Sequence, residues 1–229
     1  MVDDLREAMA AASGNRVHPM LVRVGGLAAD VTGDWLTHID AILVRAETAA
    51  QQAAEALAAR RRELDGVAIA DAALCRQYSL TGPVARACGL SLDLRTEGLL
   101  AWPEVFVAAP LQITGDVTAR FQVLIDEVAA SAKMVRRLVT GLPGGPVATR
   151  LSRRLKVPEG EHIVELEAPW GVTSVLLVSR GGQTPWRVAL RTPTFHNVSA
   201  LEPLLVGLEM HQVPDAVASV GYAVGDLDK

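Results

Sequence analysis

Few side chains in this sequence have the types and spacing that catalysis or metal binding requires. Cys75 and Cys88 do not form a CxxC pair, and two thiols are too few for an iron–sulfur cluster, which typically takes four. Cys88 could act as a nucleophile, although a free cysteine is more often a small buried apolar residue. The motifs GxGxxG, GxxxxGK[ST], HExxH and GxSxG are absent. The histidines show no spacing that suggests joint metal ligation: His18, His38, His162, His196 and His211.

The composition indicates a globular protein. The chain has 229 residues, of which 50% are hydrophobic and 21% charged, so it can build a sizeable core and is not disordered. It contains no run of about 20 apolar residues that would span a membrane. Its 22 basic and 26 acidic residues give a net charge of −4, which argues against nucleic acid as a partner. The charged start and the two cysteines favour a reduced, cytosolic setting without a secretory signal.

Two apolar stripes at helical spacing predict two long helices. The first begins at residues 33–34, with Asp34 as the expected N-cap, and extends to about Leu64. The second begins at residues 115–116 and ends at Gly141. Both stripes are heptad-like, so the helices are expected to pack on each other or on a third helix. Three arginines at 60–62 are interpreted as opposing the helix dipole rather than as a phosphate site.

The rest of the sequence predicts loops and a small sheet. Residues 78–95 mix turn residues with charges and are expected to form loops over one end of the bundle. Alternating apolar and polar residues predict strands at 161–167, 172–179 and 186–191, arranged as an antiparallel meander. A short helix is expected at 201–210. The fold class is therefore α+β, with a mainly helical part at 1–157 and the meander, short helix and C-terminal tail at 158–229.

Several segments resemble the D subunit family of NADH-quinone oxidoreductase, the large-hydrogenase-like component of respiratory complex I. The clearest are RVHPMLVRVGG at 16–26, LTGPVARACG at 80–89 and the closing GDLDK at 225–229. The resemblance covers only the C-terminal part of such a protein. Further matches follow in the family's order: Asp93-Leu94-Arg95, Gly115-Asp116 with Arg120, Glu127 with Ser131, Glu167-Ala168-Pro169, Pro185-Trp186-Arg187 and residues 191–195.

This resemblance implies a long-helix bundle followed by a small antiparallel three-stranded sheet, with cluster-facing loops in residues 1–157. It implies that His18 and Arg23 lie beside a terminal [4Fe–4S] cluster held by a small iron–sulfur subunit, with Asp228 and Lys229 near the same cluster and quinone region. The chain would bind no cofactor alone and catalyse nothing alone. Its partners would be the iron–sulfur subunit and other complex I subunits, with quinone as the substrate of the complex and NADH oxidised in another subunit. The expected location is peripheral, at the cytoplasmic face of the cell membrane.

Departures from the family pattern leave alternatives open. Gly221 stands where the family usually has an acidic residue, Val172 replaces an acidic residue, and Lys229 replaces the closing arginine. The N-terminal part with the quinone-facing histidine loop has no counterpart, and the cysteine motifs that bind nickel and iron in related hydrogenases are absent. One alternative is a non-catalytic assembly or structural relative that has lost quinone reduction. Another is a stand-alone small-molecule-binding domain, and His18 and Arg23 could merely hydrogen-bond loop carbonyls.

Overall fold

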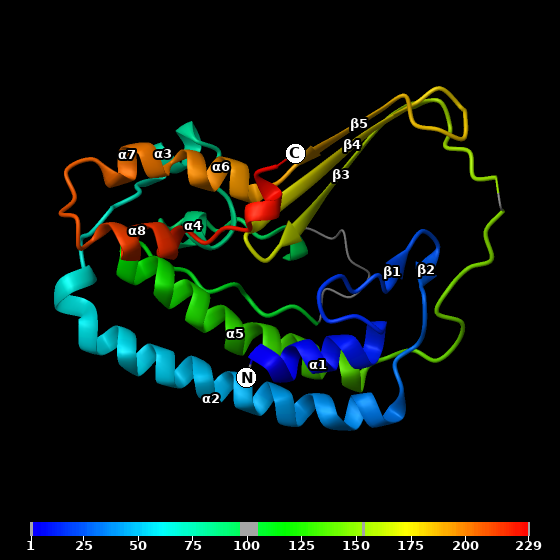
Figure 1. Ribbon diagram of the computed structural model, residues 1–229, viewed down its shortest axis with the longest axis horizontal. Helices are drawn as coiled ribbons and strands as arrows, with labels where there is room; N and C mark the ends of the chain where they lie inside the picture. The colour runs from blue at the N-terminus through cyan, green and yellow to red at the C-terminus, as the bar shows by residue number, and fades with distance from the viewer. Residues whose placement is uncertain (1, 97–104, 153, 229) are drawn as a thin grey trace.

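The computed structural model describes residues 2–96, 105–152 and 154–228, and two long antiparallel helices form its base (Figure 1). These are α2 (Gly33–Leu64) and α5 (Val117–Thr140), as the apolar stripes predict. Asp116 caps α5 by accepting a hydrogen bond from the Ala119 amide at 2.8 Å. The predicted cap of α2 was wrong. Thr32 caps it through the Trp35 amide, and Asp34 lies in the first turn, where its charge favours the helix dipole.

A third helix, α1 (Val2–Ser13), packs on the first half of α2. The indole Nε1 of Trp35 donates to the Ala8 carbonyl at 2.8 Å, and Arg45 pairs with Asp4 at 3.0 Å. Ala8 enters a small core formed where α1, α2 and α5 meet. The other buried members of that core are Ile39, Leu43 and Ala132.

The main core lies at the opposite end of the long helices, under short helices that the sequence did not predict. Residues 78–95 were predicted as loops, yet this region holds α4 (Gly82–Ala87) and the start of the 3-10 turn η1 (Leu94–Thr96), directly after the unpredicted α3 (Ala72–Gln77). Helices of six residues are too short to show an apolar period, and their start signals are the Asp71 cap and Pro83. The core includes Leu57, Leu64, Cys75, Val84, Cys88, Val117, Leu204 and Val220.

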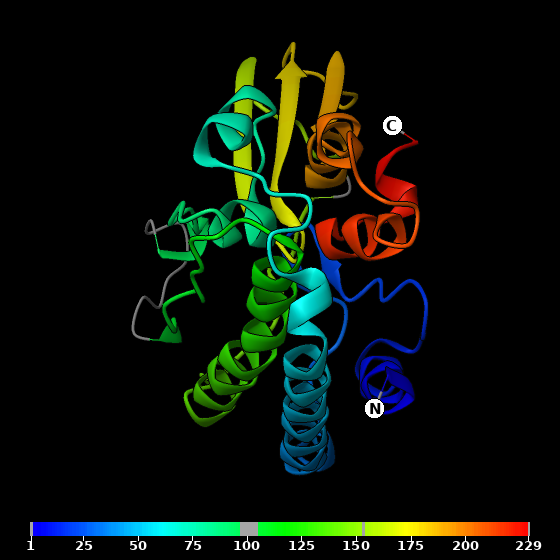
Figure 2. The same cartoon turned by 90° about the vertical axis from the view of Figure 1, so that its left-hand side faces the viewer.

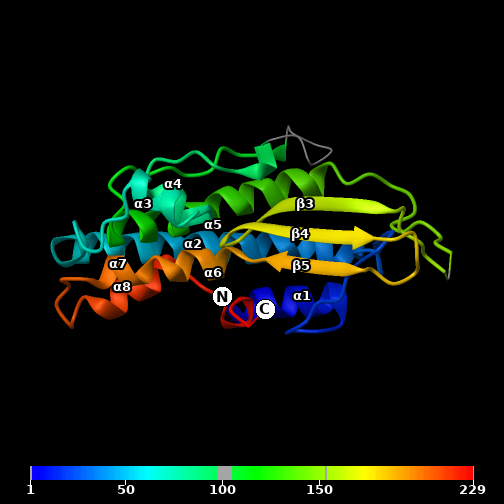
Figure 3. The same ribbon diagram turned by 90° about the horizontal axis from the view of Figure 1, so that it is seen from above.

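The predicted meander is confirmed. It consists of β3 (Gly160–Ala168), β4 (Gly171–Ser179) and β5 (Arg187–Arg191), in the order β3-β4-β5 with antiparallel neighbours. Figures 1 and 2 show the sheet and the short helices in one layer and α2, α5 and α1 in the other. Seen from above in Figure 3, no described helix or strand lies over the sheet. Residues paired across the strands share a face, and one face carries Val164, Leu166, Val175, Leu177, Val188 and Leu190.

The C-terminal segment forms three short helices and a final 3-10 turn instead of one helix at 201–210. They are α6 (Pro193–Ser199), α7 (Leu201–Leu205), α8 (Val213–Val220) and η3 (Val224–Asp226). Helix α7 stops at Leu205 because the following residue, Val206, is extended. Arg60 does more than oppose the dipole of α2, since it binds Asp215 of α8 through two hydrogen bonds of 2.7 and 3.0 Å.

The main core combines residues from both predicted domains, such as Leu64 and Val117 with Leu204 and Val220. The division at residue 157 remains a prediction. Two further short strands, β1 (Val22–Arg23) and β2 (Gly26–Leu27), form a separate hairpin. Among the described residues, no helix has both the length and the apolar character needed to cross a bilayer.

Candidate functional site

The segment that contains His18 and Arg23 is a surface loop that backbone hydrogen bonds join to residues 147–149. The β1–β2 hairpin is held by the Leu27 amide, which donates to the Val147 carbonyl at 2.9 Å, and by the Thr149 amide, which donates to Gly25 at 2.8 Å. Gly26 has a φ of +139°, and a Cβ there would lie 2.8 Å from the Ala148 Cα and closer still to the Val147 carbonyl. Glycine is therefore needed at position 26 because two backbones meet there.

Most side chains of this loop are exposed, although Arg16 lies 3.9 Å from the Glu7 carboxylate of α1 and Leu21 is half-buried. His18 and Arg23 are exposed, and neither forms a side-chain hydrogen bond or ion pair with any described residue. The alternative role, hydrogen bonding to loop carbonyls, is therefore not seen. The apolar residues around them, Val17, Met20 and Val22 with Val24, are between 73% and 79% exposed. Exposed apolar residues gathered on one loop, together with basic side chains, are typical of a protein–protein contact. We call residues 16–24 the exposed loop.

The structure does not bring Asp228, the third predicted residue, to the exposed loop. Asp228 is exposed and follows η3, and no hydrogen bond or ion pair joins it to His18 or Arg23. Figure 1 shows the C-terminus near the α6 end of the sheet, whereas β1 and β2 lie below its other end. Lys229 falls outside the described residues. The roles of all four residues remain predictions.

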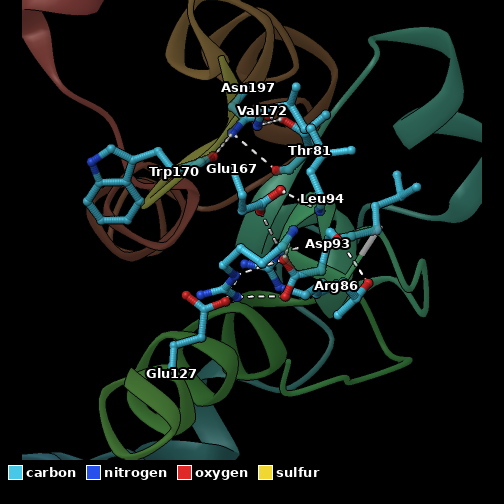
Figure 4. Close-up of polar contacts among 12 residues, drawn as sticks. Thr81, Arg86, Asp93, Leu94, Glu127, Glu167, Trp170, Val172 and Asn197 are labelled. Atoms are coloured by element: carbon cyan, nitrogen blue, oxygen red, sulfur yellow. Dashed lines mark hydrogen bonds and ion pairs between the residues drawn. The ribbon is translucent and has the colours of Figure 1, made fainter. Parts of the chain in front are cut away.

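A buried charge network joins α4, α5 and β3, and Figure 4 shows it in close-up. Arg86 of α4 is only 2% exposed. Its Nη1 donates to Glu167 Oε1 at 2.9 Å and to the Leu92 carbonyl at 3.0 Å, and its Nη2 binds Glu127 of α5. The second oxygen of Glu167 accepts from the Leu94 amide at 3.3 Å. One guanidinium thus fixes a helix, a strand and a loop relative to one another.

The network does not balance its charges fully. Arg95 pairs with Asp93 at 2.7 Å beside it, so two arginines face three carboxylates. Burial raises the pKa of Glu127 despite the opposing attraction of Arg86, whereas the pKa of Asp93 is lowered by its hydrogen bonds to Arg95 against the effect of burial. Glu127 therefore takes up a proton more readily than an ordinary carboxyl group, and Asp93 less readily.

Replacing Glu127 with glutamine should change how stability depends on pH. A carboxyl whose pKa is raised by folding stabilises the protein below its unfolded pKa of about 4.5, and that contribution is lost as pH rises through the folded pKa. The free energy of unfolding of Glu127→Gln should therefore decrease less than that of the wild type between pH 4.5 and neutrality. Urea titrations at several pH values measure this, with the exposed Glu161→Gln as control. Parallel curves for Glu127→Gln and wild type would contradict the assignment.

A second set of hydrogen bonds locks the β3–β4 turn onto the start of α4. The buried Asn197 of α6 donates to the Trp170 carbonyl at 3.0 Å and accepts from the Thr81 amide at 3.3 Å. The Thr81 hydroxyl accepts from the Val172 amide at 3.0 Å (Figure 4). The turn that holds Trp170 is thereby held against α4.

The position of Trp170 explains in part why residue 221 is glycine, where the family usually has an acidic residue. Gly221 has a φ of +66°, and a Cβ there would lie 2.5 Å from Cε3 of the Trp170 ring and closer to Cζ3. The indole therefore fills the space that a side chain at position 221 would need. An acidic residue at this position is incompatible with the present packing.

The residues of the charge network occur in the sequence only as parts of motifs, and no role was predicted for them. Arg86, Glu127 and Glu167 all lie in segments that resemble the NADH-quinone oxidoreductase family. The family motifs therefore contain all three residues. The sequence does not show, however, that Glu127 and Glu167, which lie 41 and 81 positions after Arg86, meet its side chain. Among the described residues, no group of three or more histidine, cysteine, aspartate or glutamate side chains is arranged to hold a metal ion.

With this fold and charge network established, similarity to known proteins assigns the chain to a class of respiratory-complex subunits. The family described as respiratory-chain NADH dehydrogenase, 49 Kd subunit, matches residues 3–155 and 149–229. The chain belongs to this family, which confirms the resemblance seen in its motifs.

Individual proteins that are similar to this chain extend the family assignment. The second of the D subunits of NADH-quinone oxidoreductase in Salinispora tropica is 38% identical over 99% of this chain and 60% of its own length. The H subunit of NAD(P)H-quinone oxidoreductase in Thermosynechococcus vestitus is 28% identical over 96% of this chain and 63% of its own. A chain in the structure of the membrane-bound sulfane sulfur reductase, an archaeal respiratory membrane complex, superposes with a TM-score of 0.90 at 28% identity, covering 99% of this chain and 64% of that one. The chain thus spans about 60% of the length of these relatives.

Proposed function

We propose that this chain is a component of an NADH-quinone oxidoreductase complex, in the place of its large-hydrogenase-like D subunit. It would pack against a small iron–sulfur subunit and line the region of the terminal cluster and the quinone. The observation that carries the proposal is the exposed loop, where His18 and Arg23 stand free among apolar side chains. Such a surface suits a partner protein, because burying it would remove apolar area from water.

Two other surfaces support a function inside a complex. An apolar groove of about 420 Å³ runs between α2 and α5, lined by alanines of α2 and by Phe121, Leu124 and Val128 of α5. On the sheet, Val164, Leu166, Val188 and Leu190 remain about half exposed. A chain that works alone rarely leaves so many apolar surfaces open. In this proposal, other subunits cover them, and the complex sits peripherally at the cytoplasmic face of the cell membrane.

The chemistry proposed for His18 is proton uptake coupled to electron transfer. Histidine changes charge in the physiological pH range, so an imidazole beside a [4Fe–4S] cluster of the partner subunit can gain a proton when the cluster is reduced. The guanidinium of Arg23 stays charged and would favour the reduced cluster, which raises its potential. The partner subunit would supply the redox chemistry, while this chain supplies charge, a proton and the shape of the cavity.

Isolation from native cells tests the proposal directly. The chain is purified in mild detergent through an affinity tag, and iron, acid-labile sulfide and accompanying chains are assayed. Recovery with a small iron–sulfur protein and membrane subunits is the expected result. Recovery of the chain alone and free of iron would overturn the electron-transfer role.

Replacing His18 with alanine should flatten the pH dependence of the neighbouring cluster's potential. A one-electron step coupled to one proton changes the potential by about 59 mV per pH unit, so the wild-type complex should approach that slope over part of the range. The measurement is a redox titration of the purified complex, followed by electron paramagnetic resonance at several pH values. His211→Ala, an exposed histidine before α8, serves as control. An unchanged slope in His18→Ala would exclude this role.

The second candidate is a structural relative that keeps the fold without quinone reduction. The Trp170 ring over Gly221 favours this second candidate, because the ring fills the space of a side chain that is usually acidic in the family. The matching structure of a sulfane sulfur reductase also bears this fold under a name that does not mention quinone. The two candidates differ in one assay. The purified complex with NADH reduces a soluble quinone analogue under the first proposal, and it assembles without doing so under the second.

A further inference from the structure

A long stretch of the sequence carries basic residues without an acidic one. Between Glu127 and Glu159 there are seven lysines and arginines and no aspartate or glutamate, in a chain whose net charge is −4. The last four of these basic residues are Arg150, Arg153, Arg154 and Lys156. A local excess of positive charge in an acidic protein attracts an anionic partner to that part of the surface.

The structure joins the end of this basic stretch to the turn between β4 and β5. The Ser179 hydroxyl donates to the Val157 carbonyl at 2.8 Å, and the Trp186 amide donates to the Val178 carbonyl at 2.8 Å. Residues 154–157 and 180–187 therefore lie together, and we call them the basic tip. Figures 1 and 3 show this region at the end of the sheet that is farther from α6, beyond the body formed by the helices.

The side chains of the basic tip combine positive charge with apolar surface. The Cζ of Arg180 lies over the Trp186 ring, 3.3 Å from its centroid. Trp186 is nevertheless 63% exposed, and Leu155 is 46% exposed. The tip contains no acidic residue, and Glu159 and Glu161 beside it offset only two of its four cations. Those cations are exposed and form no ion pair with any described residue: Arg154, Lys156, Arg180 and Arg187.

We infer that the basic tip binds the surface of a bilayer that contains anionic phospholipids. The unpaired cations would lie among the head-group phosphates, which attract lysine and arginine side chains close to the membrane surface. The indole of Trp186 would enter the interface, where tryptophan is enriched because its ring is apolar and its N–H is polar. Leu155 would add apolar contact beside it. Each of these groups is already exposed, so binding requires no opening of the fold.

Two features favour a bilayer over a nucleic acid or a folded partner protein. Arg180 covers one face of the Trp186 ring, which reduces the aromatic surface available for stacking on bases. The tip also projects from one end of the molecule, so it can meet a flat surface without interference from the helices (Figure 1). The inference does not rest on the proposed function, because binding of lipid by this chain involves neither the cluster nor the quinone.

Co-sedimentation of the purified full-length chain with lipid vesicles tests the inference. Vesicles of phosphatidylcholine alone are compared with vesicles of phosphatidylcholine and phosphatidylglycerol. The chain should bind only the anionic vesicles, and a change from about 0.1 M to about 1 M salt should release it, because the screening length falls from about 10 Å to about 3 Å. Lys156→Gln combined with Arg180→Gln should weaken binding about 30-fold, since each cation near the surface contributes about fivefold.

The matched control combines Arg61→Gln with Arg62→Gln. These two arginines are exposed at the end of α2, away from the basic tip, and their replacement changes the net charge equally (Figure 1). The control should bind anionic vesicles as the wild type does. Tryptophan emission should shift to shorter wavelength when the wild type binds, and Trp186→Phe should lose most of this shift. Circular dichroism verifies that each variant is folded.

Three results would overturn the inference. The first is absence of binding to the anionic vesicles, or equal binding to both kinds of vesicle. The second is an equal loss of binding in the control variant, because general charge rather than the basic tip would then explain the attraction. The third is binding to polyuridylic acid at the same salt concentration without binding to the anionic vesicles, which would assign the basic tip to nucleic acid. None of these results bears on the electron-transfer role proposed for His18.

Discussion

Replacing Arg86 with methionine is expected to destabilise the protein by about 3–5 kcal/mol, the cost of removing one partner from a buried ion pair. The side chain is 2% exposed, and its removal leaves Glu127 and Glu167 without a cation hydrogen-bonded to them, with only Arg95 of the described residues nearby. Native proteins are stable by only about 5–15 kcal/mol, so this loss is a large share of the total. Urea denaturation followed by circular dichroism measures it. The defect should be smaller at low pH, because protonation of Glu127 removes one of the two charges.

Two controls separate lost charge from lost packing in this experiment. Arg95→Met removes an arginine whose partner, Asp93, is close in sequence and whose side chain is more exposed, so its effect should be clearly smaller. The triple replacement Arg86→Met, Glu127→Leu and Glu167→Leu should recover much of the stability, since apolar side chains can replace a buried charge network. A loss below about 1 kcal/mol for Arg86→Met would show that the network does not hold α4, α5 and β3 together.

Introducing aspartate at Gly221 is the second large effect that we expect. The backbone at this position has a φ of +66°, a strain of about 1–3 kcal/mol for a residue with a side chain. The new Cβ would also overlap the Trp170 ring, and overpacking of this kind adds about 1–3 kcal/mol. The expected result is a marked fall in melting temperature, measured by calorimetry.

Gly225 provides the matched control for this substitution. It lies in η3, has no positive φ, and has open space around its Cα. Gly225→Asp should therefore leave stability nearly unchanged. Combining Gly221→Asp with Trp170→Ala should restore part of the loss, because it removes the overlap but not the backbone strain. Equal effects at positions 221 and 225 would show that the indole does not govern what position 221 can hold.

Long and periodic elements could be predicted from the sequence. The apolar stripes of α2 and α5 run through helices of 32 and 24 residues, and both helices match their predicted bounds closely. The meander was predicted because its strands alternate over five to nine residues. Helices α3, α4 and α6 escaped because six or seven residues carry no measurable period. Their caps and prolines are the only local signals, and the same residues are also common in turns.

The sequence by itself determined the α+β class, the long helices, the meander and, through its motifs, the family. These features depend on periodicity and on residue order, both of which are read along the chain. Tertiary structure alone decided which charges meet. Arg86 reaches Glu127 and Glu167, Arg60 reaches Asp215, and Trp170 covers Gly221. Each contact joins segments that are distant in the sequence, so its partners are chosen by packing, and packing has no signature in a single sequence.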